Sequence, residues 1–264
     1  MNVRLWARGP DVWLVGTAAR ARTVILAVLI GLLEAACDLG LVSPTTFSPP
    51  SQIIISLWKI LRSGSFNGQI WSTISNVMAA MMISVVAGFA VGILAHAIPR
   101  VRQAIEPLLA SCYSIPGFIF YVPLLGIFGL NDAPLISVGC ILAIPSMVLA
   151  TFNGLDRIPT VLLRFSRVCH LGFFQTMFLI KLPSALPYLF SGIRLCLAYS
   201  FIGVIASEFI LSDRGVGYSI AFAYHDFDIK TMYALMLLII VLVTGVNMGL
   251  NAWENKLMAK RGRR

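Results

Sequence analysis

Apolar residues occur along this chain in long runs, separated by shorter segments that contain most of the charged residues. A helical run of about 20 apolar residues is long enough to cross the hydrocarbon core of a bilayer. Because lipid cannot hydrogen-bond an unpaired backbone, each such run must be helical. The pattern predicts an all-α membrane protein with six spans, at Thr23–Val42, Val77–Ile98, Leu108–Leu130, Pro134–Phe152, Pro187–Leu211 and Thr231–Leu250.

Prolines and glycines inside these runs predict how the helices bend and pack. Kinks are expected at three prolines, which must be buried against neighbouring helices: Pro116, Pro123 and Pro145. Two G-x-x-x-G pairs, Gly88 with Gly92 and Gly245 with Gly249, predict close helix contacts in the second and sixth spans.

Two segments near the amino end allow more than one interpretation. Basic residues precede the first apolar run, as in a signal peptide, but Glu34 and Asp38 interrupt its end and no convincing cleavage pattern follows, which favours a retained anchor. After a proline-rich stretch, Ile53, Leu57 and Ile60 recur at helical spacing beside Lys59 and Arg62. This pattern predicts an interfacial helix on the outer surface.

Composition agrees with a membrane protein. Of 264 residues, 58% are hydrophobic and 12% are charged, with a mean hydropathy of +0.88. Soluble domains contain about 25% charged residues, so water is not the main solvent of this fold. The net charge of +9 raises the question of nucleic acid, but the basic residues lie in loops and tails instead of on one face of a globular domain. No nucleic-acid partner is expected.

The positions of lysine and arginine predict the orientation. Basic residues near span ends resist translocation and therefore stay in the cytoplasm. Fifteen lie in the N-terminal segment, the second and fourth loops and the C-terminal tail, whereas four lie in the other loops. We therefore expect a cytoplasmic segment at 1–22, a transmembrane domain at 23–250 and a basic cytoplasmic tail at 251–264, in a multi-pass membrane protein.

The fourth loop, 153–186, is long for a connection between membrane helices and has internal order. Asp156 is a plausible N-cap, and an apolar face follows at Val161, Leu162, Phe165, Val168 and Cys169. Gly172 can end this helix in the left-handed conformation, and a second apolar run is expected to stop at Pro183 and Pro187. The result is a helix–glycine–helix elbow, for which periodicity alone also allows an amphipathic segment lying on the membrane.

An ordered series of short motifs resembles one transporter family. The series consists of Ser114-Ile115-Pro116, Gly172, Leu182-Pro183-Ser184-Ala185-Leu186-Pro187, Gly192-Ile193-Arg194-Leu195, residues 202–208 and Gly215-Val216-Gly217. It is similar to binding-protein-dependent ABC transporter permeases, specifically the nitrate, sulfonate and taurine importer group. The resemblance implies a type I importer fold, a location in the bacterial inner membrane as a multi-pass protein, and a translocation pathway for a small solute.

The resemblance also implies partners and coupling residues. Such a permease pairs with a second permease subunit, here expected to form a homodimer, with a cytoplasmic ATP-binding subunit and with an extracytoplasmic substrate-binding protein. The family's loop begins with Glu-Ala-Ala six residues before the glycine, where this chain has Ser166, Arg167 and Val168. The resemblance assigns ATPase contacts to Phe165, Ser166, Arg167, Val168, Gly172 and Pro183, without the usual carboxylate.

The residues give no indication of an enzyme. No glycine directly precedes any of the five lysines, so the G-x-x-x-x-G-K-[ST] phosphate loop is lacking, and ATP and magnesium are expected on the partner ATPase. Three scattered histidines form no H-E-x-x-H metal pattern, and five cysteines lack a Cys-x-x-Cys spacing, so no cofactor, metal or disulfide is expected.

Two ionisable residues in the fifth predicted span remain open to two interpretations. Arg194 and Glu208 are fourteen residues apart, hence about 21 Å along a helix, and cannot pair with each other. They are candidates for the translocation pathway or a gate, although hydrogen bonding between helices is the commoner use of such groups. The alternative to an ATP-driven importer is an ion-coupled secondary transporter, which would favour carboxylate relays and inverted repeats; neither is evident.

Overall fold

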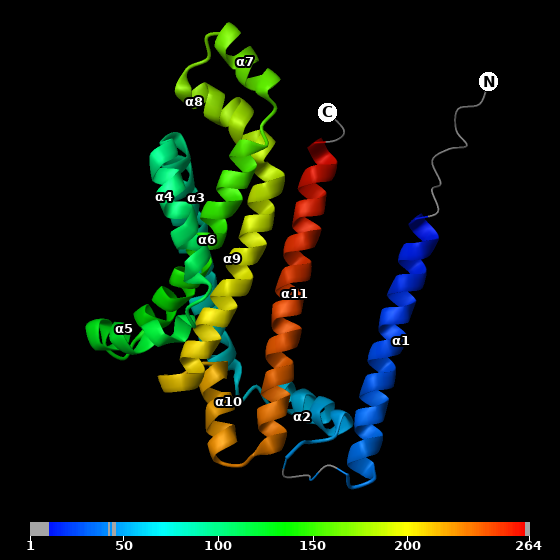
Figure 1. The fold of residues 1–264 in the computed structure, drawn as a ribbon. Helices are drawn as coiled ribbons and strands as arrows, with labels where there is room; N and C mark the ends of the chain where they lie inside the picture. Colours follow the sequence, from blue (N-terminus) through cyan, green and yellow to red (C-terminus); the bar gives the residue numbers. More distant parts are fainter. Residues whose placement is uncertain (1–10, 42, 44–45, 262–264) are drawn as a thin grey trace, which may run out of the picture.

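The computed structural model describes residues 11–41, 43 and 46–261, and all regular elements in this part of the chain are helical. The elements are α1 (Asp11–Asp38), α2 (Pro50–Ser63), α3 (Asn67–Ala97), α4 (Pro99–Cys112), the 3-10 turn η1 (Gly117–Phe120), α5 (Tyr121–Phe128), α6 (Asp132–Asp156), α7 (Thr160–Val168), α8 (Phe173–Thr176), the π turn η2 (Met177–Lys181), α9 (Leu182–Leu211), α10 (Val216–His225) and α11 (Ile229–Arg261). The predicted all-α class is confirmed (Figure 1).

The core is a three-helix unit of α3, α6 and α9, in which α6 contacts both other helices along its length. Small residues make these contacts close. A Cβ atom added to Gly88 would lie 2.6 Å from the Cβ of Met147, and one added to Gly92 would lie 2.6 Å from the Cβ of Thr151. The first G-x-x-x-G pair therefore packs α3 on α6, as predicted. Gly245 and Gly249 on α11 face open space within this chain.

Among the residues that the structure describes, four helical segments are long and apolar enough to cross a membrane: α3, α6, the segment Met177–His225 that contains α9, and α11. The third predicted span is not one straight helix. It comprises α4 and the η1–α5 segment, which meet at 97°. Pro116 precedes η1 and its ring nitrogen cannot donate a hydrogen bond, so the helix cannot continue across Ser114–Pro116. The predicted kink is thus a sharp break.

Helices α1 and α11 lie outside the three-helix unit. In Figure 1, α1 stands apart from α11, and it contacts α2 at the end opposite α7. There, Glu34 accepts hydrogen bonds from the backbone N–H (3.0 Å) and hydroxyl (2.5 Å) of Ser51. The apolar side chains of α1 between Val24 and Leu33 are exposed. Helix α2, predicted as interfacial, lies across this end of the molecule.

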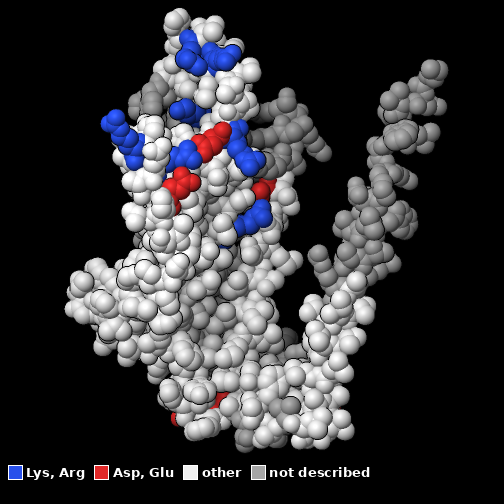
Figure 2. Space-filling view, in the orientation of Figure 1, with Lys and Arg blue, Asp and Glu red and all other residues white. Residues whose placement is uncertain are grey.

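In the view of Figure 2, the visible lysines and arginines lie toward one end of the molecule, while acidic atoms show at both ends. Figure 2 shows lysines and arginines over the end that holds α7, with acidic side chains among them, and a white middle section. This agrees with the basic second and fourth loops predicted to be cytoplasmic. Arg4 and Arg8, and Arg263 and Arg264 of the tail, lie outside the described residues.

Candidate functional site

The fourth predicted loop contains a short amphipathic helix, α7, at the basic end of the molecule (Figure 1). The five residues of its predicted apolar face are all exposed: Val161, Leu162, Phe165, Val168 and Cys169. The side chains of Phe165 and Val168 are 58% and 77% exposed. A nine-residue helix with its apolar face uncovered has a surface suited to docking against another protein.

The two ends of α7 differ from the prediction. Asp156 is not its N-cap, because α6 continues through Asp156 and Pro159 precedes the first turn of α7. At the carboxyl end, the left-handed residue is His170, with φ of 49°, and not Gly172. The backbone N–H of His170 donates to the carbonyl of Arg167 (3.1 Å), and the backbone N–H of Leu171 donates to the carbonyl of Ser166 (2.9 Å). These are the two bonds of a Schellman motif, which closes the helix two residues earlier than predicted.

The second half of the elbow is continuous with the next membrane helix. Pro183 and Pro187 were expected to stop the second apolar run, but α8 passes through the π turn η2 directly into α9. The backbone N–H of Leu182 donates to the carbonyl of Met177, five residues back. This wider turn accommodates Pro183, which has no N–H to donate to an α-helical ladder. Pro183 therefore lies in the first turn of α9.

The predicted coupling residues fall on two sides of the elbow. Phe165, Arg167, Val168 and Gly172 are exposed, and Pro183 is half-buried. Ser166 is 5% exposed, and its hydroxyl donates to the carbonyl of Leu163 at 2.9 Å. The position where the resemblance led us to expect an acidic residue thus faces the inner side of α7 in this chain.

A cluster of charges connects the base of the elbow to the membrane helices. Asp156, the last residue of α6, accepts two hydrogen bonds from the guanidinium of Arg102 on α4, at 2.7 and 2.6 Å. A ring nitrogen of His96 near the end of α3 lies 3.1 Å from the same carboxylate. Bidentate arginine–carboxylate pairs fix orientation as well as distance. Three helices therefore meet at the residue from which the elbow begins.

Arg194 and Glu208 lie in separate inter-helix contacts. Arg194 on α9 forms an ion pair with Glu254 on α11. Glu254 lies in the segment predicted to be a basic cytoplasmic tail. A glutamate among lysines, one turn beyond the last apolar run, was the available sign of an ion pair there. Glu208 and Glu254 do not belong to a metal site, since the described residues contain no cluster of three His, Cys, Asp or Glu side chains that could hold a metal ion.

Glu208 is buried where α9 meets α3 and the start of α10. The hydroxyl of Thr73 on α3 lies 2.9 and 2.8 Å from its two oxygens, and the backbone N–H of Gly217 donates to it at 3.0 Å. Val216 donates its N–H to the Thr73 hydroxyl at 2.8 Å. A carboxylate at a helix amino terminus satisfies N–H groups that have no partner within the helix. Glu208 therefore joins three helices.

Gly215 is required beside this carboxylate. Its φ is 100°, and a Cβ atom there would overlap the carboxyl group of Glu208. The backbone N–H of Gly215 donates to the side-chain oxygen of Gln69 at 2.5 Å. In the sequence, Gly215 and Gly217 are recognisable only as part of a resemblance. Thr73 and Gln69 give no signal, because polar residues at the start of a long apolar helix have no distinctive spacing.

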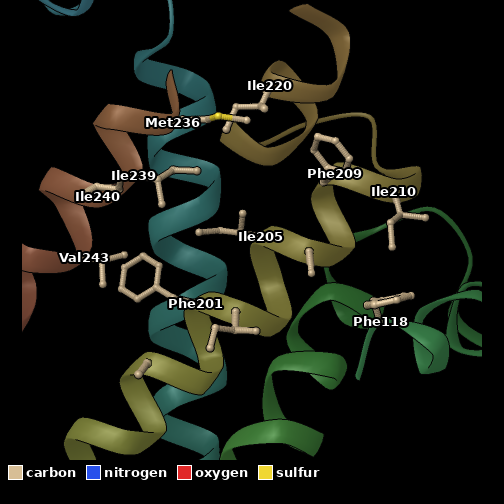
Figure 3. Close-up of a pocket in the computed structure, with 13 residues that line it drawn as sticks. Phe118, Phe201, Ile205, Phe209, Ile210, Ile220, Met236, Ile239, Ile240 and Val243 are labelled. Atoms are coloured by element: carbon tan, nitrogen blue, oxygen red, sulfur yellow. The ribbon is translucent and has the colours of Figure 1, made fainter. Parts of the chain in front are cut away.

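An apolar pocket of about 700 Å³ lies on the other side of the same helix, between α9 and α11. Figure 3 shows Phe201 and Ile205 of α9 on the side of Ile239 and Val243 of α11, with Phe209 farther along α9 and Phe118 of η1 at the rim. All thirteen lining residues are apolar. Such a surface suits lipid or another apolar helix, and not a charged solute.

Comparison with known proteins agrees with this arrangement. A family model described as "Binding-protein-dependent transport system inner membrane component" matches residues 80–260. The taurine transport system permease protein TauC of Escherichia coli is 25% identical over 90% of this chain and 88% of its own length. The glycine betaine/proline betaine transport system permease protein ProW of the same species is 31% identical over 61% of this chain and 46% of its own length.

The fold also matches a solved transporter. A structure of the MetNI methionine ABC transporter in an inward-facing conformation superposes with a TM-score of 0.64, at 21% identity, over 71% of this chain and 93% of that chain. At this identity the match concerns the fold. Taken with the family model, which matches residues 80–260, it shows that the chain belongs to the inner-membrane components of binding-protein-dependent transport systems, as a permease subunit of an ABC importer.

Proposed function

We propose that the elbow of this permease, residues 153–186, docks on a separate cytoplasmic ATPase and transmits its movement to the membrane helices. The observation that supports this most is the uncovered apolar face of α7 at the basic end of the molecule. Full burial of a Val, Leu or Phe side chain stabilises a contact by about 1.5–3 kcal/mol, so burying several such residues would contribute substantially to an interface. ATP and magnesium then bind to the partner and not to this chain.

The interface would differ from that of relatives in its charge. Ser166 lies on the inner side of α7, so the family's acidic contact is replaced by the exposed Arg167 and the apolar pair Phe165 and Val168. Gly172 and the first turn of α9 around Pro183 would border the docking surface. The cluster of Arg102, Asp156 and His96 at the base of the elbow would transmit its displacement to α3, α4 and α6.

The permease would work as a homodimer. Two uncovered surfaces support a second copy: the apolar side chains of α1, and Gly245 with Gly249 on α11, which meet nothing within 4 Å in this chain. In this proposal Arg194 and Glu208 act on the gate by holding helices together, and they do not contact the solute. The Arg194–Glu254 pair can hold α9 against α11 until the cytoplasmic side opens.

The solute would be small and delivered by an extracytoplasmic binding protein. Related permeases are named for taurine, glycine betaine and nitrate, which share small size but not charge. Both termini would be cytoplasmic, in agreement with the distribution of lysine and arginine.

Uptake by cells that express the permease together with a cognate cytoplasmic ATPase and substrate-binding protein tests this proposal. Phe165→Glu and Val168→Glu place charges on the apolar face and should abolish ATP-dependent uptake and co-purification of the ATPase, while the permease still reaches the membrane. Arg167→Glu and Gly172→Asp should weaken both. Cys169→Ser, at an exposed neighbour, should change neither. Uptake that survives the two glutamate substitutions, or that collapses with an uncoupler but not with ATP depletion, would rule the proposal out.

A further inference from the structure

A second cavity, of about 310 Å³, lies between the end of α4, α6 and α9 and differs in chemistry from the apolar pocket. We call it the tyrosine groove. Three tyrosines line it together with three other hydrogen-bonding side chains and one leucine used below: Tyr113, Tyr188, Tyr199, Ser146, Asn153, Ser191 and Leu195. No charged side chain is among its lining residues.

The groove extends from the elbow end of the molecule to the middle of the membrane domain. Asn153 lies three residues before the end of α6. Tyr199 is near the middle of α9, about 26 Å from its first residue at 1.5 Å per residue and about 18 Å from its last. Tyr113 directly follows α4, at the 97° break in the third predicted span. The broken helix therefore leaves space for the groove at mid-membrane depth, where transporters commonly bind their solutes between interrupted helices.

The deep end of the groove is formed by two stacked rings. The centroids of Tyr113 and Tyr199 are 4.9 Å apart with an interplanar angle of 29°. Both rings are half-buried. The faces of aromatic rings carry negative charge density, and tyrosine attracts ammonium groups that come within about 6 Å of the ring. Hydroxyl and amide groups nearby provide hydrogen bonds without adding a fixed charge.

At the shallow end of the groove, a cationic side chain already lies over the face of a tyrosine ring. The guanidinium of Arg157 lies 5.5 Å from the ring centroid of Tyr188. Tyr188 precedes Tyr199 by eleven residues on α9, hence by about 16 Å. That exceeds the Debye length of about 8–10 Å at moderate ionic strength, so in a water-filled groove the charge of Arg157 acts at the mouth and weakly at the stacked rings.

We propose that the tyrosine groove is a hydrated solute site on the cytoplasmic half of the pathway, and that it favours small solutes bearing an ammonium or alkylated ammonium group over bare inorganic anions. The inference rests on the proposed permease function and identifies a site and a ligand class for it. Its test needs neither the ATPase nor the binding protein, so that failure of ATPase docking and failure of this site are distinguishable.

The test measures thiol modification in inside-out membrane vesicles. Leu195→Cys places a reporter one helical turn from Tyr199, in a chain whose Cys37, Cys112 and Cys169 are replaced by serine. The buried Cys140 and Cys196 are kept, and the rate of this parent chain is subtracted. Two membrane-impermeant methanethiosulfonates, one with a trimethylammonium group and one with a sulfonate, are compared. The ratio of the reaction rates of the cationic and anionic reagents is measured at the reporter and at a free thiol in solution. At the reporter this ratio should be about 3–10-fold higher.

Ring substitutions separate the aromatic face from the hydroxyl. Tyr199→Phe keeps the ring and should keep the preference for the cationic reagent, whereas Tyr199→Leu should reduce it to the free-thiol ratio. Val86→Cys, exposed near the middle of α3 on a helix surface that lines neither cavity, is the lipid-facing control and should react with neither reagent. Gel filtration of each purified variant checks that it is folded.

A second measurement uses the free ion. Tetramethylammonium chloride should slow modification of the Leu195→Cys reporter by a neutral maleimide, and sodium nitrate at the same ionic strength should not. No reaction at Leu195→Cys, a faster reaction with the anionic reagent, or a preference unchanged by Tyr199→Leu would each overturn the proposal.

Discussion

Glu208 illustrates how a residue's position decides between two uses of a buried charge. A carboxylate in the middle of a bilayer is costly and commonly marks a pathway. Glu208 is 1% exposed, but the Thr73 hydroxyl and the Gly217 N–H both donate to it, and it adjoins the amino terminus of α10. Because the carboxylate is enclosed by donors from two other helices, it stabilises the position of α10 and has no surface open to a solute.

The contact between Thr73 and Glu208 can be measured directly. Thr73→Val removes the hydroxyl that both donates to Glu208 and accepts from Val216, and should lower stability by about 1–3 kcal/mol, because buried polar groups lose their partners. Thr73→Ser keeps the hydroxyl and is the matched control. The measurement is the thermal unfolding midpoint in detergent, where each kcal/mol corresponds to roughly 2–4 °C in a domain of this size.

A double-mutant cycle shows whether the two residues act as a pair. Combining Thr73→Val with Glu208→Gln should destabilise the protein by less than the sum of the single changes, because either change alone already disrupts the contact. Additive effects would mean that the hydrogen bonds contribute little and that Glu208 has another use.

At the scale of elements, the two G-x-x-x-G pairs look equivalent in the sequence but differ in the fold. Gly92 packs against Thr151 of α6, whereas Gly249 meets nothing in its own chain. Gly92→Val should therefore destabilise the fold by about 1–3 kcal/mol through overpacking, seen as a lower unfolding midpoint in detergent.

The same substitution at Gly249 should have a different consequence. Gly249→Val should leave the unfolding midpoint of the separated chain nearly unchanged but weaken the homodimer, because a side chain would then lie on a surface we assign to the second copy. Analytical ultracentrifugation in detergent measures the dimer fraction. An unchanged dimer fraction would remove this helix from the interface.

Helices and their packing glycines could be predicted from the sequence, but several helix ends could not. Apolar runs predict α3, α6 and α9 because membrane helices must satisfy their own backbone. The break at Ser114–Pro116 was underestimated, since a proline predicts a kink but not its angle. The end of α7 was misplaced because His170, and not Gly172, adopts the left-handed conformation. Pro183 was taken as a stop, although a preceding π turn lets the helix continue.

In the candidate site, too, local features could be predicted from the sequence, whereas contacts between distant helices could not. The apolar face of α7 follows from local periodicity, whereas its exposure is a property of the fold. The partners of Arg194 and Glu208 and the stacking of Tyr113 on Tyr199 depend on how distant helices meet. Sixty residues separate Arg194 from Glu254, and no local pattern reports such a contact.

At the scale of the whole molecule, function depends on which side of the membrane holds the elbow. The chain has two chemically different ends. One has the elbow and the cluster of Arg102, Asp156 and His96, and the other has α2 and the contact between Glu34 and Ser51. Since basic residues near span ends stay in the cytoplasm, the elbow end is expected on the side where ATP is available.

Single-cysteine labelling tests this orientation. Cys169 is exposed on the elbow, and Ser65→Cys, an exposed position between α2 and α3, places a thiol at the opposite end. An impermeant maleimide added to spheroplasts should label the chain with Ser65→Cys but not the chain that retains only Cys169. Inside-out vesicles should give the reverse, because the membrane then shields the other end. Labelling of Cys169 from the outer side would invert the topology and place the docking surface of α7 beyond the reach of a cytoplasmic ATPase.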